Sequence, residues 1–211
     1  MISYIFPYMD SRAEQFEETK KSLEAQTDQD FEIIVVPVKH TNPVIAQNEG
    51  ARQAKGDILV LTSPEVVNAT TNVEEIKLLP KGMFWLGHVV EIHQIELDGI
   101  YTKDVLREFV GMTEGITARC VAGNWDSWRY FIGAIYKEDY WAIGGMDEEF
   151  ADGIAWEDRE FASRVDANLK TAFNPNIVGV HLWHPRTYQD NGPELRQRNK
   201  DLFIKRSMYG Q

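Results

Sequence analysis

Three short and almost continuously apolar runs lie within the first 62 residues, at positions 2–8, 31–36 and 57–62. The segments between them, residues 11–26 and 46–55, have the character of helices, and the first carries apolar residues at helical spacing. Continuously apolar strands that alternate with amphipathic helices are typical of a buried parallel sheet, because the helices cover both of its faces. We therefore predict an α/β fold for this chain.

The turns that follow these three strands are expected to hold the functional site. In an open α/β sheet, ligands bind in the crevice beyond the carboxyl ends of the strands. The segments that follow the three runs, residues 8–12, 37–40 and 63–65, are therefore predicted to surround one crevice.

The rest of the chain shows no internal repeat, no low-complexity segment and no break in composition, so we predict a single domain. The clearest helix covers residues 157–169, where Phe161, Val165 and Leu169 recur with polar residues between them. Pro193, a favoured residue of a first helical turn, begins the last expected helix. The other elements that we expect are strands at 83–95, 129–136 and 176–183 and a short helix at 102–110.

The composition limits the class of protein. The chain has 211 residues, of which 43% are hydrophobic, enough to bury a substantial core. Its 33 acidic residues outnumber its 22 basic ones, and the net charge of −11 argues against non-specific binding to nucleic acid or anionic lipid. The single cysteine, Cys120, excludes an internal disulfide. No apolar run approaches the roughly 18 residues of a transmembrane helix, and the first residues lack the pattern of a signal peptide, so we expect a cytoplasmic protein.

Three stretches of the chain carry a further pattern. The first stretch is made of Pro7, Arg12, Gln26, the strand at 31–36, Asn48, Gly50, Gly56 and Asp57. The second stretch is residues 144–148 followed by 156–158, and the third is residues 180–185. Together and in this order, the three stretches resemble the GT-A glycosyltransferases, in particular their large inverting family. The second stretch is similar to the acceptor-side motif of galactosyl- and N-acetylgalactosaminyltransferases.

This resemblance covers most of the chain and is weakest from residue 66 to 128. It implies a Rossmann-like mixed sheet of the GT-A type, with a nucleotide-binding half, an acceptor and catalytic half, and a C-terminal helix. These parts would cover residues 1–66, 67–190 and 191–211. The implied reaction is the transfer of a sugar, with inversion, from a nucleotide-sugar donor to a saccharide or another hydroxyl acceptor. UDP is implied by the resemblance alone, because residues 37–40 replace the acidic pair with which the family holds the base.

The resemblance also implies a divalent metal site. The family places an Asp-x-Asp triplet after the third strand, and here the triplet is Ser63-Pro64-Glu65, which keeps one carboxylate. Glu65 suits Mn²⁺ or Mg²⁺, because hard cations take carboxylate oxygens and fill their remaining positions with phosphate and water. The family match favours His181 as a second ligand, with His184 turning into the crevice if the strand ends early. The alternative readings are a solvated loop glutamate and hydrogen-bonded structural histidines.

Asp158 is the predicted general base of the reaction. It follows Glu157 in the first turn of the helix at 157–169, where unpaired backbone N–H groups and the helix dipole stabilise an anion. A base that accepts a hydroxyl proton has to be ionised at neutral pH, so this position suits it. Glu157 is predicted to orient the acceptor or to substitute for Asp158. The alternative is that both are ordinary acids at a helix start.

The remaining predicted site residues belong to the donor. The resemblance implies that Gly144 and Gly145 lie beside the donor sugar, where the absence of side chains admits it, and the alternative is an ordinary turn. Trp156 is expected to stack on a sugar face, and the alternative is core packing. Arg186 lies in a polar stretch that we interpret as a lid over the diphosphate. The resemblance adds four further donor-site residues, Pro7, Arg12, Asn48 and Ser63.

Two other functions stay open from the sequence. A nucleotidyltransferase would need a glycine-rich loop with a basic residue after the first strand, and residues 8–12 contain no glycine. A non-catalytic GT-A-like protein that binds a saccharide or a partner is favoured by the reduced Ser63-Pro64-Glu65 triplet. The retention of Glu157, Asp158 and His181 argues against that reading.

Overall fold

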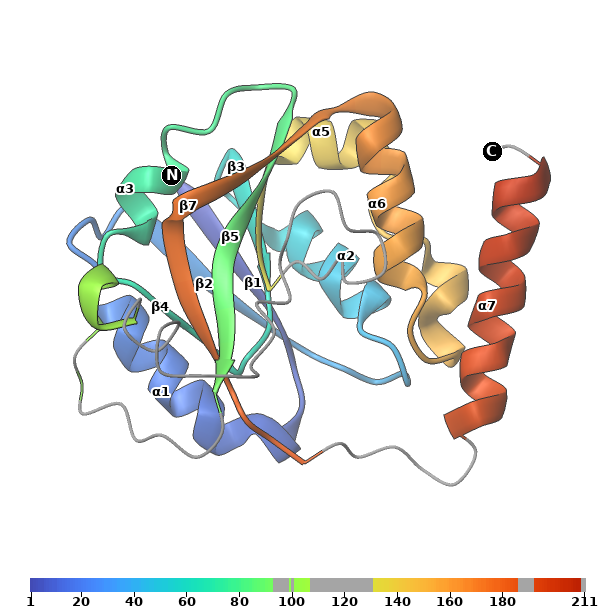
Figure 1. Ribbon diagram of the computed structural model, residues 1–211, viewed down its shortest axis with the longest axis horizontal. Coiled ribbons are helices and arrows are strands. Elements are labelled where there is room, and N and C mark those ends of the chain that lie inside the picture. The colour runs from blue at the N-terminus through green and yellow to red at the C-terminus, as the bar shows by residue number, and fades with distance from the viewer. Residues whose placement is uncertain (93–98, 100, 107–130, 186–191, 210–211) are drawn as a thin grey trace.

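The computed structural model describes residues 1–92, 99, 101–106, 131–185 and 192–209 of the chain. Its centre is a seven-stranded mixed sheet with the strand order β2-β1-β3-β6-β5-β7-β4 (Figure 1). Neighbouring strands are parallel from β2 to β3 and between β5 and β7, whereas β6 and β4 run antiparallel to their neighbours. The strands are β1 (Ile2–Tyr8), β2 (Phe31–Pro37), β3 (Ile58–Thr62), β4 (Val66–Asn68), β5 (Met83–Ile92), β6 (Ile132–Tyr136) and β7 (Lys170–Leu182).

Helices cover both faces of the sheet (Figure 1). Two of the α-helices, α1 (Ala13–Glu24) and α3 (Asn72–Ile76), pack on one face. The opposite face carries α2 (Val44–Gln53), α5 (Lys137–Ala142) and α6 (Glu157–Asn168). The remaining helical segments are η1 (Asp10–Arg12), η3 (Glu148–Asp152) and α7 (Gly192–Tyr209).

The burial of both faces explains why the first strands are continuously apolar. In β3, Leu59 and Leu61 contact the core under α2 and α6, while Ile58 and Val60 contact the core under α1 and α3. In β1 the same alternation sends Ile5 to one side and its two aromatic neighbours to the other. Because successive side chains of a strand point to opposite faces, a strand covered twice has no position for an exposed polar residue. The structure confirms the predicted α/β fold with a mixed sheet.

The late strand starts earlier than expected. The sequence predicts a strand at 176–183, but β7 begins at Lys170 and pairs in parallel with β5 from Met83 onward. The first half of β7 is mostly polar and largely exposed. Backbone pairing with β5 holds it in the sheet, and the sequence therefore shows no apolar pattern there. The register shifts between Gly87 and His88, where an irregularity separates the polar half of the pairing from the buried half.

The other expected elements are found close to their predicted bounds. The expected helix at 157–169 is α6, and the helix that begins near Pro193 is α7. Of the helix expected at 102–110, residues 103–106 are helical, and 107–110 lie outside the described residues, as does Cys120. Among the helices that the structure describes, none combines the length and apolar character that crossing a membrane requires.

Phe161 is expected to be a strong contributor to the stability of this fold. Its side chain is fully buried, and its ring centroid lies 6.0 Å from that of Phe84 and 5.8 Å from that of Tyr140. Phe161→Ala should lower the free energy of unfolding by about 3–5 kcal/mol, because it leaves a cavity between α6 and the sheet. Urea denaturation measures this, with Phe173→Ala as the control: Phe173 is 38% exposed, and its loss should cost less than about 1 kcal/mol. Equal losses in the two variants would contradict this packing.

Candidate functional site

The pairing of β4 with β7 brings two distant segments of the chain together. The two strands are antiparallel, with Val66 opposite His181. The backbone N–H of Leu182 donates to the carbonyl oxygen of Glu65 over 2.9 Å. This ladder therefore places Glu65, which precedes β4, beside the carboxyl end of β7.

Glu65, His181 and His184 form a compact cluster at this edge. The Glu65 Oε1 atom lies 3.5 Å from His181 Nε2 and 3.4 Å from His184 Nε2. One ligand atom of each side chain lies within 4.8 Å of the others. Glu65 is 9% exposed and His181 is 6% exposed, and the Phe131 ring packs 4.6 Å from the His181 ring. The cluster thus consists of a buried carboxylate, a buried imidazole and the partly buried imidazole of His184.

The histidines decide the charge of the carboxylate. Burial by itself raises the pKa of Glu65, because it removes water from the charged form. The hydrogen bonds from His181 and His184, and then their charges, outweigh this effect and hold the pKa of Glu65 well below its ordinary value. Glu65 is therefore an anion at neutral pH, the protonation state that a metal ligand needs.

The predicted acid pair follows an unusual stretch of backbone. Glu157 and Asp158 occupy the first turn of α6, as expected, and both are partly buried. Trp156 caps this helix with φ 73°, and Ala155 before it has φ 58°, so both lie in the left-handed region. In Figure 1, the last turn of α6 meets the start of β7. The first turn of α6, with Glu157 and Asp158, and the carboxyl end of β7, with His181, are therefore the ends of these two elements that lie far from the junction.

The Gly144-Gly145 turn is held from the side of α6. Both glycines have positive φ values, 91° and 66°, which only glycine adopts without strain. Arg164 Nη1 donates to the carbonyl oxygens of Ile143 and Gly145, each over 2.6 Å. The same guanidinium binds both carboxylate oxygens of the buried Glu160, so its position is determined within the helix.

Asn48 holds the turn from the opposite side. Its amide donates to Met146 O over 2.9 Å, and its oxygen accepts from Met146 N over 2.9 Å and from the Tyr140 hydroxyl over 2.6 Å. A Cβ added at Gly145 would lie only 2.8 Å from the Asn48 oxygen. Asn48 is 2% exposed, so the structure places it beneath the turn, where it binds the backbone of Met146.

The other predicted donor residues lie in several places. Pro7 is buried in β1, and Arg12 is buried at the start of α1, with its Nε lacking a hydrogen-bond partner among the described residues. The Ser63 hydroxyl is likewise buried and, within the described part of the chain, unpaired. The Trp156 ring packs against α7, with its centroid 5.4 Å from that of Phe203. Arg186 lies outside the described residues.

Two residues of this region were not predicted from the sequence, Glu160 and Arg164. The one signal for them is their spacing, since opposite charges four residues apart on a helix are neighbours. That spacing indicates an ion pair, but it does not indicate that the arginine also binds the carbonyls of a distant glycine turn.

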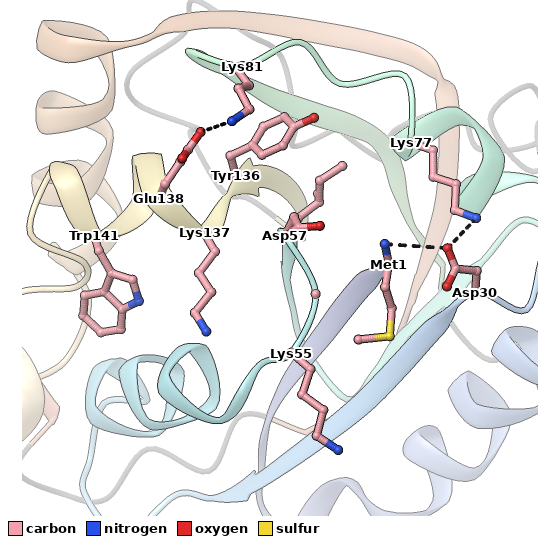
Figure 2. Close-up of a pocket in the computed structure, with 12 residues that line it drawn as sticks. Met1, Asp30, Lys55, Asp57, Lys77, Lys81, Tyr136, Lys137, Glu138 and Trp141 are labelled. Carbon is pink, nitrogen blue, oxygen red and sulfur yellow. Dashed lines mark hydrogen bonds and ion pairs between the residues drawn. The ribbon is translucent and has the colours of Figure 1, made fainter.

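A cavity of about 920 Å³ lies at a different edge of the sheet (Figure 2). Met1 and Asp57, which adjoin the starts of β1 and β3, line it, whereas Glu65 follows the end of β3. Of its lysines, Lys77 pairs with Asp30 over 2.9 Å and Lys81 pairs with Glu138 over 2.5 Å. This cavity lies at the amino ends of these strands and is not part of the candidate site.

No protein-family model matches the chain, and no curated protein matches it in sequence. Solved structures do match. The crystal structure of GalNAc-T7 with UDP, GalNAc and Mn²⁺ matches with a TM-score of 0.67 and 14% identity, over 97% of this chain and 47% of that one. That of S. aureus TarS matches with a TM-score of 0.64 and 12% identity, over 100% of this chain and 40% of that one.

A third match is the mannosyltransferase PcManGT from Pyrobaculum calidifontis in complex with GDP-Man and Mn²⁺. Its TM-score is 0.60 at 14% identity, and the match covers 100% of this chain and 64% of that one. This chain therefore spans less than half the length of GalNAc-T7 and TarS. At 12–14% identity the likeness concerns the fold, and the chain has the mixed α/β fold of the GT-A glycosyltransferases.

Proposed function

We propose that the protein is a metal-dependent glycosyltransferase that moves a sugar from a nucleotide-sugar donor to an acceptor hydroxyl, with inversion. The observation that carries this proposal is the convergence of Glu65, His181 and His184 at the carboxyl edge of a GT-A sheet. Two of the matching structures, GalNAc-T7 and PcManGT, were solved with Mn²⁺ and with UDP or GDP-Man.

Glu65, His181 and His184 would hold the metal ion. The donor set of one carboxylate oxygen and two imidazole nitrogens fits a first-row transition metal better than Mg²⁺, because Mg²⁺ prefers oxygen ligands alone, and the imidazoles suit Fe²⁺ and Zn²⁺ in particular. This chemistry favours Mn²⁺ over Mg²⁺. When bound, the ion supplies positive charge against the departing nucleoside diphosphate. Three protein ligands leave room in its shell for diphosphate oxygens.

The proposed base is Asp158, supported by Glu157. The Asp158 carboxylate accepts the proton of the acceptor hydroxyl while the hydroxyl oxygen forms a bond to the anomeric carbon of the donor. The bond from that carbon to the diphosphate oxygen breaks on the opposite side, so the configuration inverts. The first-turn position stabilises the carboxylate as an anion, because the helix dipole and the unpaired backbone N–H groups of that turn face it.

The donor sugar would lie against the Gly144-Gly145 turn, which Asn48 and Arg164 hold rigid from two sides. Arg12 and Ser63 each keep a buried polar atom without a partner among the described residues, as expected of side chains that a ligand completes. The choice between UDP and GDP is open, because residues 37–40 carry no acidic pair.

A non-catalytic GT-A-like binding protein is the second candidate. Ser63 stands where the family has its first metal-binding aspartate, which favours this reading. The pairing of Glu65 with two histidines argues against it, because the two imidazoles supply ligands in place of the missing carboxylate.

Metal binding is the first test. Titration with Mn²⁺, followed by the loss of the free-ion electron paramagnetic resonance signal, should show one site in the wild type. Glu65→Gln and His181→Gln should each weaken it by at least about 100-fold, because each removes one of three ligands. Glu74→Gln changes an exposed glutamate on α3 and is the matched control. Competition with Mg²⁺, Fe²⁺ and Zn²⁺ ranks the ions. Mn²⁺ binding of unchanged affinity in both Glu65→Gln and His181→Gln would contradict the proposed metal site.

Catalysis is tested by slow hydrolysis of the donor, which needs no acceptor. A panel of UDP- and GDP-sugars with Mn²⁺ should give turnover of one donor that EDTA abolishes. Asp158→Asn should lower kcat by at least about 100-fold with little change in donor KM, because the base acts only in the transition state. Asp166→Asn alters an exposed aspartate on the same helix and should leave kcat unchanged. Metal-dependent nucleotide binding without any turnover would favour the non-catalytic candidate.

A further inference from the structure

The backbone before the proposed acid pair is strained at two successive residues. Ala155 and Trp156 are the non-glycine residues with positive φ within the described part of the chain, at 58° and 73°. Residues with a Cβ adopt this conformation at a cost in free energy, so the surrounding structure has to hold them there. Glu157 and Asp158 follow directly, and their direction depends on these two backbone angles.

The side chain that holds this strained turn comes from α7. Asn199 is fully buried, and its amide donates to Ala155 O over 2.9 Å and to Phe150 O over 3.1 Å. The loop closes tightly around it, since a Cβ added at Gly153 would lie 2.0 Å from the Asn199 oxygen. The backbone N–H of Ile154 also donates to α7, at Leu195 O over 3.2 Å. The turn is therefore built around an amide that belongs to another part of the chain.

Other residues of α7 grip the two ends of the same loop. Arg206 forms ion pairs with Asp147, over 3.1 Å, and with Glu149, over 3.0 Å. At the far end, the Trp156 ring lies 5.4 Å from the Phe203 ring, with Lys200 Nζ 5.9 Å from its centroid. Figure 1 shows α7 beside α6 at the outside of the molecule, away from the sheet. Its buried contacts thus centre on η3 and on the start of α6.

We propose that α7 is a positioning element for the proposed acid pair and that Asn199 is its central positioning residue. By holding Ala155 and Trp156 in the left-handed conformation, Asn199 determines where α6 begins and aims Glu157 and Asp158. This rests on the proposed function in one respect, the role of Asp158 as base. The alternative is that Asn199 contributes to stability alone.

The test uses Asn199→Asp, which keeps the shape of the side chain and removes both N–H donors. The kcat of donor hydrolysis should fall about 100-fold, because displacing a catalytic group by about 1 Å lowers the rate by that factor. Donor KM and the affinity for Mn²⁺ should stay within about twofold, since Glu65 and the histidines are untouched. Gln197→Ala, an exposed change on the same helix, is the control. Arg206→Gln loosens α7 without opening the core and should give a smaller loss of kcat.

A second substitution separates positioning from stability. Ala155→Gly removes the strain at residue 155 and leaves that at Trp156, because glycine takes positive φ readily, so Asn199→Asp combined with Ala155→Gly should recover part of the lost kcat. A stability role predicts instead that kcat stays near the wild-type value while Tm falls. A parallel loss of kcat and donor affinity, without recovery in the double variant, would also overturn the proposal.

Hydrogen exchange gives a readout that does not depend on activity. Backbone amides of residues 153–160 should exchange faster in Asn199→Asp and slow again in the double variant, while amides of β1 and β3 stay unchanged. If these amides behave as expected but the wild type hydrolyses no donor, the proposed function fails and the hold of α7 on the turn stands. If their exchange does not change in Asn199→Asp, the positioning proposal fails whatever the activity.

Discussion

The pairing of β7 with both β5 and β4 is the constraint on which the candidate site depends. β7 runs parallel to β5 along its length, and its buried end pairs antiparallel with β4. Asn72 of α3 strengthens this edge, because its side chain exchanges two hydrogen bonds with the backbone of Val178, over 2.8 and 3.0 Å. A shift of this ladder by one residue would turn His181 to the other face of the sheet and separate it from Glu65. The geometry of the proposed metal ligands is thus a consequence of strand register.

The negative net charge of the chain explains why binding an anionic donor would require a metal ion. With a net charge of −11, the protein repels an anionic nucleotide-sugar at long range. Arg12 is a buried cation close to the end of β1, but many of the other basic side chains are engaged in ion pairs, as Arg164 and Arg206 are. In the proposed reaction, a divalent ion held by Glu65, His181 and His184 would supply concentrated positive charge where the diphosphate departs. The low pKa of Glu65 keeps this carboxylate ionised across neutral pH.

The elements that were predicted from the sequence are those whose buried side chains form a simple pattern along the chain. β1, β2 and β3 are apolar on both faces, and α6 buries one stripe, so both patterns are visible in the chain. The first half of β7 was missed because its pairing with β5 is made by backbone groups, which leave no trace in polarity. The grouping of Glu65 with the histidines came from resemblance to a family and not from spacing. The hold of Asn48, Arg164 and Asn199 on distant carbonyls was not predictable, because a side chain that bonds to backbone carries no periodic signal.

One helix links the donor side of the proposed site to its acceptor side. Arg164 on α6 binds the Gly144-Gly145 turn, and the Ala155-Trp156 turn, which α7 holds through Asn199, sets the start of α6. The buried Glu160 pairs with Arg164 in two hydrogen bonds, so the ion pair is fully matched and costs little despite its burial. Because α6 is one continuous helix of 12 residues, a displacement of its first turn also displaces Arg164 in its second half, and the reverse holds. The proposed reaction, which brings an anomeric carbon and an acceptor hydroxyl together, would need this relative placement, and side chains that bind backbone carbonyls provide it.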